Sequence, residues 1–305
     1  MPKSRPVGIL QLWAPATLLY FAMSAPAQLK SENSPLEHGE QTSIPITTRW
    51  TLEAAGPVQQ VEINSVVLLI CPFAQMKGTG FLIDAGLIVT NNHVLNGCTA
   101  EQMQGITSQG SAITFTKSAV DKDVDLALLK PSHQLTGGLH LAAADKPKVG
   151  ASVSTWGYPL AFNGPAPILS TAILAGFIED GIGGKKVKHL ILNGAINPGN
   201  SGGPLFQGND DKVIGIVVAK YLPYSPQVQT LISLLASNTK SMLSGVGSGN
   251  FVGKDAQGNE ITVTPSMVTA SVLQEFYNGT QVSLGEAISV EELKTLLASK
   301  ASELR

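Results

Sequence analysis

A glycine-rich stretch around one serine is the first place in the sequence where residue types and spacing indicate chemistry. Residues 197–205 have the sequence NPGNSGGPL, with Ser201 at the centre. Glycines let the backbone turn sharply enough to present the serine hydroxyl and to aim nearby N–H groups at a developing negative charge. The stretch predicts acyl transfer with Ser201 Oγ as nucleophile and an oxyanion hole at Gly199, Asn200 and Ser201. Within that hole, the N–H groups of Gly199 and Ser201 are the expected donors. The alternative is a glycine-rich turn with an unreactive serine.

A serine nucleophile requires a base, and that base requires a carboxylate to orient it. His93 is the candidate base among the five histidines, because it lies at the end of an apolar, β-branched stretch. The alternative for His93 is an ordinary core or surface histidine. Asp125 is the candidate carboxylate, because it opens the apolar stretch 126–129 and would be held partly out of water. Asp121 and Asp123 are alternatives that are more typical of solvated loop acids.

Short strands are the elements that must position these residues. Apolar runs separated by turn residues lie at 61–70, 80–90, 112–116, 126–130, 151–156, 190–192 and 213–219. Their length, β-branched content and spacing predict an all-β sandwich or barrel.

The composition excludes several classes of function. Charged residues make up 14% of the chain and the formal net charge is -2, whereas a typical soluble domain carries about 25% charged residues. Extensive disorder and a basic nucleic-acid surface are therefore disfavoured. The sequence has no metal-ligand spacing and no phosphate-binding loop, so we expect no cofactor, no metal and no nucleic-acid partner.

The N-terminal segment has the layout of a secretory signal peptide. Lys3 and Arg5 precede an apolar run at 9–23, and an A-x-A-like cleavage site follows at 25–27. The run is shorter than the roughly 20 residues that span a bilayer. We predict a signal peptide at 1–27, a flexible leader at 28–44, and an exported, periplasmic or secreted protein without stable membrane insertion. An uncleaved N-terminal anchor is the alternative.

The three candidate residues lie in motifs that resemble a known family. The order His93, Asp125, Ser201 within TNNHV, DVDLALLK and NPGNSGGPL resembles the chymotrypsin-fold (trypsin-like) serine proteases, and most closely their HtrA (Deg) type. Further matches are GTGF at 78–81, GYP at 157–159, AI at 195–196, and ITVTPSMV at 261–268, which resembles the last barrel strand entering the closing helix. The resemblance covers about residues 60–280.

This resemblance implies two six-stranded antiparallel Greek-key β-barrels with the site in the cleft between them. His93 and Asp125 would come from the first barrel and Ser201 from the second. His93 would take the proton from Ser201 and return it to the leaving amine, while Asp125 fixes the imidazole tautomer.

The resemblance also assigns a specificity pocket, with Ala195 at its floor and Val218, Ala219 and Lys220 along one wall. No carboxylate lies at that floor, so small or aliphatic P1 residues are expected; Lys220 either narrows the pocket or is a solvated strand-end lysine. Proteases that are activated by cleavage to a new N-terminus carry an aspartate where this chain has Asn200. We therefore predict activity without that cleavage.

The two cysteines are expected to form one disulfide. The family habit of bracing the catalytic histidine implies a bridge between Cys71 and Cys98, and an oxidising compartment would permit it. Two buried free thiols are the alternative.

The domain organisation follows from the same resemblance. We expect a protease domain at 45–280 with a helical insertion at about 222–258, and a C-terminal helical tail at 281–305 without a PDZ-like domain. In the alternative, the protease ends near residue 225 and a small separate domain follows. Homo-oligomer formation remains open, since no contact residues are identified.

The expected function is that of an exported serine endopeptidase that acts on unfolded or damaged polypeptides. The alternative is a protease-fold protein that binds peptides by strand addition, with hydrolysis weak or lost.

Overall fold

The computed structural model describes residues 44–74, 76–143, 147–160, 162, 164–180, 185–220, 251–254, 260–263, 269, 273 and 284–304. The chain divides into two compact units, Glu40–Tyr224 with Phe276–Arg305, and Met1–Gly39 with Ser225–Glu275. The expected signal peptide, nearly all of the leader and most of the expected insertion at 222–258 lie outside the described residues.

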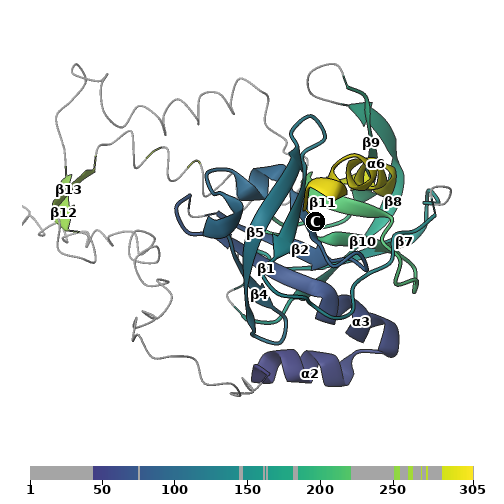
Figure 1. Ribbon diagram of the computed structural model, residues 1–305, viewed down its shortest axis with the longest axis horizontal. Helices are drawn as coiled ribbons and strands as arrows, with labels where there is room; N and C mark the ends of the chain where they lie inside the picture. The colour runs from purple at the N-terminus through teal and green to yellow at the C-terminus, as the bar shows by residue number, and fades with distance from the viewer. Residues whose placement is uncertain are drawn as a thin grey trace, which may run out of the picture. The chain divides into compact units, whose positions relative to one another are not determined.

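The first half of the larger unit is a closed antiparallel barrel (Figure 1). Its strands, which run in the order β1-β2-β3-β6-β5-β4, are β1 (Val66–Cys71), β2 (Met76–Leu82), β3 (Ile88–Asn91), β4 (Gln104–Thr107), β5 (Ala112–Asp121) and β6 (Leu126–Pro131). The apolar β6 residues 126–129 are all fully buried. This burial on both faces explains the continuous apolar pattern.

The second half is another closed antiparallel barrel, with the order β10-β11-β14-β9-β8-β7. Its strands are β7 (Ser152–Gly157), β8 (Ile168–Asp180), β9 (Val187–Asn193), β10 (Pro204–Gln207), β11 (Gly215–Lys220) and β14 (Leu284–Ser289). One buried apolar cluster contains Phe81 of the first barrel together with Trp156 and Phe206 of the second. The barrels thus share a core, and the predicted all-β chymotrypsin-like fold is confirmed.

The closing strand of the second barrel is not the one that the sequence predicted. The last barrel strand was expected at 261–268, but residues 261–263 lie in β13 (Glu260–Val263), which pairs with β12 (Phe251–Lys254) in a two-stranded sheet of the other unit. The barrel is closed instead by β14, which pairs with both β11 and β9. The closing strand therefore lies beyond the expected domain end at residue 280, and the expected helical tail begins with a strand.

Two helices that were not predicted from the sequence precede the first barrel. These are α2 (Ile46–Ala54) and α3 (Pro57–Ser65), so the first half of the run 61–70 is helical (Figure 1). Pro57 stands in the first turn of α3, where its missing N–H costs nothing. The Ser65 hydroxyl donates to the carbonyl of Val61 and satisfies the last turn. Fully buried Ile63 then packs into the shared core.

A helix follows β14 within the expected helical tail at 281–305. Ser289 caps α6 (Val290–Lys300) by accepting a hydrogen bond from the Glu291 N–H, and a 3-10 helix, η3 (Ala301–Leu304), follows. Leu293 and Leu296 of α6 are buried in the shared core. Within the described ranges, the structure contains no helix with the length and apolar character needed to cross a membrane.

Candidate active site

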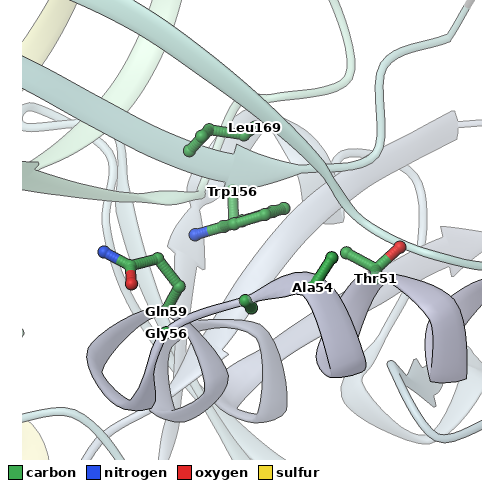
Figure 2. Close-up of a pocket in the computed structure, with 7 residues that line it drawn as sticks. Thr51, Ala54, Gly56, Gln59, Trp156 and Leu169 are labelled. Atoms are coloured by element: carbon green, nitrogen blue, oxygen red, sulfur yellow. The ribbon is translucent and has the colours of Figure 1, made fainter.

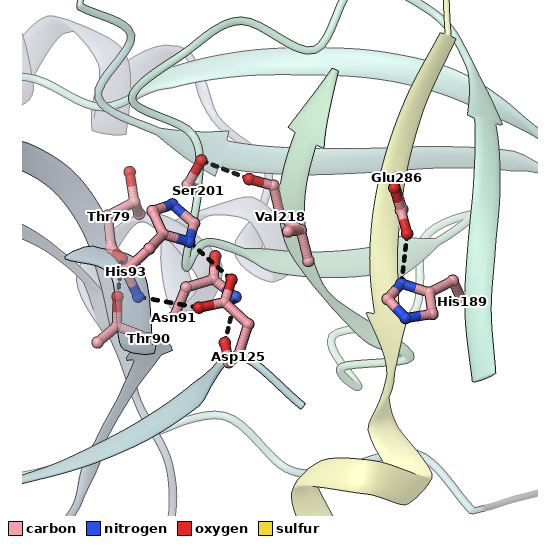
Figure 3. Close-up of polar contacts among 9 residues, drawn as sticks. All are labelled: Thr79, Thr90, Asn91, His93, Asp125, His189, Ser201, Val218 and Glu286. Carbon is pink, nitrogen blue, oxygen red and sulfur yellow. Dashed lines mark hydrogen bonds and ion pairs between the residues drawn. The ribbon is translucent and has the colours of Figure 1, made fainter. Parts of the chain in front are cut away.

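His93 and Asp125 come from the ends of two neighbouring strands of the first barrel. β3 ends at Asn91, opposite Leu126 of β6, and the 3-10 helix η1 (Asn92–Leu95) follows and carries His93. Asp125 immediately precedes β6. Its Oδ2 lies 2.6 Å from His93 Nδ1, and its Oδ1 accepts a hydrogen bond of 2.9 Å from the His93 backbone N–H (Figure 3).

The backbone at Asp125 is in an unusual conformation. Its φ is 59°, and no other non-glycine residue in the described part of the chain has a positive φ. The Asn91 side-chain amide and the Asn92 N–H both donate to the Asp125 carbonyl, at 3.0 and 3.1 Å. These bonds stabilise a conformation that L residues rarely adopt, and strain of this kind recurs at functional sites.

The two alternative carboxylates lie elsewhere. Asp121 forms an ion pair of 2.7 Å with Lys185. Asp123 is exposed, and its N–H donates to Asp121 Oδ1. Of the three acids that the sequence offered, Asp125 is the one that contacts His93.

Hydrogen bonds to the backbone carbonyl groups of residues 198–201 hold the turn around Ser201 in place. Four consecutive carbonyls accept backbone or hydroxyl hydrogen bonds: Pro198 from Leu160 N at 2.8 Å, Gly199 from Thr79 Oγ1 at 2.7 Å, Asn200 from Gly203 N at 2.9 Å and Ser201 from Thr79 N at 2.9 Å. The C=O and N–H of a trans peptide point in opposite directions. The N–H of Gly199 is therefore turned away from Leu160.

The three N–H groups predicted to form the oxyanion hole differ in whether they already donate a hydrogen bond within the protein. Asn200 N–H donates to the Asn197 carbonyl at 3.1 Å, so this group is already bonded. The N–H groups of Gly199 and Ser201 donate to no other residue within the described part of the chain. Gly199 has a φ of 97°, and a Cβ there would lie 2.4 Å from the Tyr158 carbonyl oxygen, so the turn requires glycine.

The Ser201 hydroxyl donates to the carbonyl oxygen of Val218 at 2.6 Å. Figure 3 shows the His93 ring between Asp125 and Ser201, with Nδ1 bonded to the carboxylate. The structure thus brings the three residues together, while the serine hydroxyl is directed at the β11 backbone rather than at the imidazole.

The predicted pocket residues are only partly described. Ala195 is exposed and Val218 is half-buried. Ala219 and Lys220 belong to β11, but their side chains lie outside the description. Sequence reasoning missed Glu286 of β14, which pairs with Ala219 across the sheet and whose Oε1 lies 2.5 Å from His189 Nδ1 (Figure 3). Because 281–305 was assigned to a helical tail, nothing in the sequence placed this carboxylate near the β11 strand.

The cysteines that the resemblance paired are bonded. The Cys71–Cys98 disulfide joins the end of β1 to the loop that follows η1. It therefore ties the helical turn that carries His93 to the first barrel.

A buried carboxylate lies outside the His93–Ser201 region and was also missed. Burial raises the pKa of Glu62 on α3 to about 7, partly offset by the hydrogen bond of 2.8 Å that Trp156 Nε1 donates to its Oε2. The indole of Trp156 also lines a pocket of about 390 Å³ between the α2–α3 turn and the second barrel (Figure 2). The remaining lining residues are Thr51, Ala54, Ala55, Gly56, Gln59 and Leu169.

Comparison with known proteins agrees with this fold. Residues 78–216 match the family model of the trypsin-like peptidase domain. The protease Rv3671c of M. tuberculosis, in its inactive form, superimposes with a TM-score of 0.51 and 19% identity over 87% of this chain and 98% of that chain. At that identity the likeness shows the fold alone.

Several sequence relatives are named as serine proteases. A probable periplasmic serine endoprotease DegP-like from Pseudomonas putida is 33% identical over 144 residues, which is 47% of this chain and 29% of the relative. The putative serine protease HhoB of Synechocystis is 29% identical over 150 residues, 48% of this chain and 35% of the relative. The aligned segment thus spans about a third of each of these relatives. The chain has the chymotrypsin fold, part of it matches the trypsin-like peptidase domain, and among its relatives are serine proteases of the HtrA/DegP type.

Proposed function

We propose that this protein is an exported serine endopeptidase that cleaves peptide bonds through an acyl-enzyme on Ser201. The observation that carries the proposal is the contact of 2.6 Å between His93 Nδ1 and Asp125 Oδ2 beside the Ser201 turn. A relative classed as a serine endoprotease supports the same reaction for this chain.

The mechanism begins with the serine hydroxyl. Ser201 Oγ rotates from the Val218 carbonyl toward His93 Nε2, which takes its proton as the oxygen attacks the substrate carbonyl. Asp125 keeps the other proton on Nδ1, so Nε2 is the basic nitrogen, and it stabilises the imidazolium that forms. His93 then protonates the leaving amine, and water attacks the acyl-enzyme by the same route in reverse.

The oxyanion of each tetrahedral intermediate is placed at the Gly199 and Ser201 N–H groups. Because the carbonyls of this turn are already bonded, the donors need no rearrangement when charge develops. One such donor typically contributes about 10²–10³ in kcat.

The substrate is an extended, unfolded polypeptide. Strand addition against a sheet edge needs main-chain groups free of their own secondary structure, which unfolded or damaged proteins offer. We place small or aliphatic P1 side chains against Ala195, Val218, Ala219 and Lys220, where a difference of one methylene changes discrimination by about 1–3 kcal/mol.

One observation favours the alternative of a peptide-binding protein with weak hydrolysis. The Ser201 hydroxyl bonds to Val218 rather than to His93. If that bond persists with a substrate peptide present, the cleft holds the peptide without attacking it. Measurable peptide binding with turnover equal to that of Ser201→Ala would favour this function.

Export is proposed from the N-terminal sequence and from relatives that are named as periplasmic. Mass spectrometry of the mature N-terminus tests this directly. Removal of residues 1–27 is expected, and an intact N-terminus would support the uncleaved anchor.

Casein hydrolysis tests the enzymatic function. Wild type is expected to degrade casein and Ser201→Ala to be inactive. Ser132→Ala, which removes an exposed hydroxyl bonded to Thr114 of the first barrel, is the matched control and is expected to retain activity. Equal rates for wild type and Ser201→Ala would overturn the proposal.

A further inference from the structure

We infer that Thr79 is a positioning residue that fixes the turn from which the oxyanion hole is built. The inference rests on the proposed function of Ser201 and extends it to a residue that the mechanism above does not use. Thr79 lies in β2 of the first barrel and is fully buried, whereas the turn that it holds belongs to the second barrel.

Every polar group of Thr79 is bonded to a segment of the site. Its hydroxyl donates to the Gly199 carbonyl at 2.7 Å and accepts the Tyr158 N–H at 3.0 Å. Its N–H donates to the Ser201 carbonyl at 2.9 Å, and its own carbonyl accepts the Thr90 hydroxyl at 2.7 Å. A hydroxyl is needed here because one group must both donate and accept.

The bonds from Thr79 do not hold the two peptide units that carry the oxyanion donors, but the peptide units next to them. The N–H groups of Gly199 and Ser201 belong to peptides whose carbonyls are held by Leu160 and Gly203. Thr79 holds the two remaining carbonyls, those of Gly199 and Ser201. Four consecutive peptide planes are thereby fixed, and the turn is restricted to one conformation.

The packing leaves no room for the turn to shift. At Gly202, where φ is 85°, a Cβ would lie 2.1 Å from the Thr79 carbonyl oxygen. At Gly157, beside Tyr158, a Cβ would lie 3.0 Å from Thr79 Oγ1. Thr90 also lies in β3, the strand that leads to His93. Through its side chain and its backbone, Thr79 therefore connects the barrel that carries His93 to the turn that carries Ser201.

Thr79→Val tests the role of the hydroxyl, because valine keeps the shape and removes the donor and acceptor. We expect kcat/KM to fall by about 10–100-fold, with the loss in kcat and KM nearly unchanged. Thr79→Ser restores the hydroxyl and is expected to recover most of the activity.

Ser65→Ala is the control. Ser65 is also buried and loses one hydroxyl bond, to the Val61 carbonyl of its own helix, and it touches no carbonyl between Pro198 and Ser201. We expect Tm to fall in both Thr79→Val and Ser65→Ala, but Ser65→Ala should keep most of the wild-type kcat/KM. Equal losses of activity in both would show that Thr79 acts only through stability.

An oxyanion-specific readout separates positioning from folding. A peptide aldehyde forms a tetrahedral adduct that needs the hole, whereas the corresponding peptide amide binds without one. Thr79→Val is expected to weaken aldehyde inhibition by the same factor as kcat/KM and to leave amide inhibition unchanged. Should Thr79→Val fail to fold, Thr79→Ala is judged by the same criteria.

The outcomes for the two proposals are distinct. A wild type that neither hydrolyses casein nor differs from Ser201→Ala contradicts the proposed function. Three results would contradict the positioning role alone, given an active wild type. They are equal kcat/KM in Thr79→Val and wild type, an unchanged ratio of aldehyde to amide inhibition in Thr79→Val, and no recovery of activity in Thr79→Ser.

Discussion

At the scale of single residues, Asp125 binds His93 through both carboxylate oxygens, one to the ring and one to the backbone. This leaves the imidazole little freedom to turn. The identity of the acid was open among three aspartates in the sequence. The contacts of Asp125 with His93 single it out, and its backbone there has a positive φ that is supported by bonds from Asn91 and Asn92, which no sequence pattern reveals.

Asp125→Asn tests the orienting role of that carboxylate. The amide can still accept from the His93 N–H, but its NH₂ facing Nδ1 favours the tautomer whose Nε2 carries the proton. We expect kcat to fall by about 10⁴ with little change in KM, measured with a peptide substrate. Asp123→Asn, at an exposed position, should leave kcat unchanged. Comparable activity in Asp125→Asn and wild type would exclude this role.

Glu62 gives the protein a stability that depends on pH. Its pKa is raised from 4.5 to about 7 by burial, so the folded state binds a proton more tightly than the unfolded state between these values. The free energy of unfolding should therefore fall as pH rises from about 4.5 to about 7, with a slope from this group of at most about 1.4 kcal/mol per pH unit.

Glu62→Gln removes this titration and keeps an acceptor for Trp156. Urea unfolding at pH 5 and pH 8 should show a smaller loss of stability with rising pH in Glu62→Gln than in wild type. The exposed Glu53→Gln serves as control and should behave like wild type. Identical pH dependence in all three proteins would refute the assignment.

At the scale of elements, the turn that carries Ser201 packs closely against the first barrel at Gly202. A Cβ there would lie 2.1 Å from Thr79 O and 2.2 Å from Thr90 Oγ1. We expect Gly202→Ala to lower the free energy of unfolding by about 2 kcal/mol or more and to abolish activity.

Gly208→Ala is the control for that substitution. Gly208 also has a positive φ, of 64°, but a Cβ there would meet nothing within 4 Å. Only backbone strain of about 1 kcal/mol is expected, with activity retained. Chemical denaturation and casein hydrolysis measure both effects, and equal losses in the two variants would contradict the packing argument.

The elements that differ from the sequence-based prediction are those that depend on long-range pairing. Residues 261–268 and β14 (Leu284–Ser289) both have strand-like stretches, and the choice between them depends on which one pairs with β9 and β11. Likewise, 61–65 forms the end of α3 because Ile63 packs into the shared core. Such long-range partners are not encoded in local propensity.

At the scale of the whole molecule, the second barrel depends on its C-terminal strand. β14 pairs with both β9 and β11, and α6 packs on β11 and β14 (Figure 1). A chain truncated after residue 280 should therefore lose the fold of the second barrel. Circular dichroism and casein hydrolysis check this, and a folded, active 45–280 fragment would refute it.

The strand content and the candidates Ser201, His93 and Asp125 could be predicted from the residues because they depend on short motifs with strict local requirements, whereas the two-barrel architecture was implied by the family resemblance. Ser201 needs glycines on both sides, and the run 126–129 needs burial on both faces. Thr79 was not identified as a site residue, because its hydrogen bonds to the Ser201 turn arise where strands distant in sequence meet.

The central claim is that Ser201 is a nucleophile activated by His93. Fluorophosphonate labelling, followed by mass spectrometry of the peptide that carries residue 201, tests it most directly. We predict stoichiometric labelling of Ser201 in the wild type, labelling slowed strongly in His93→Ala and none in Ser201→Ala. An unlabelled wild type, or a label on another serine that persists in Ser201→Ala, would contradict the account.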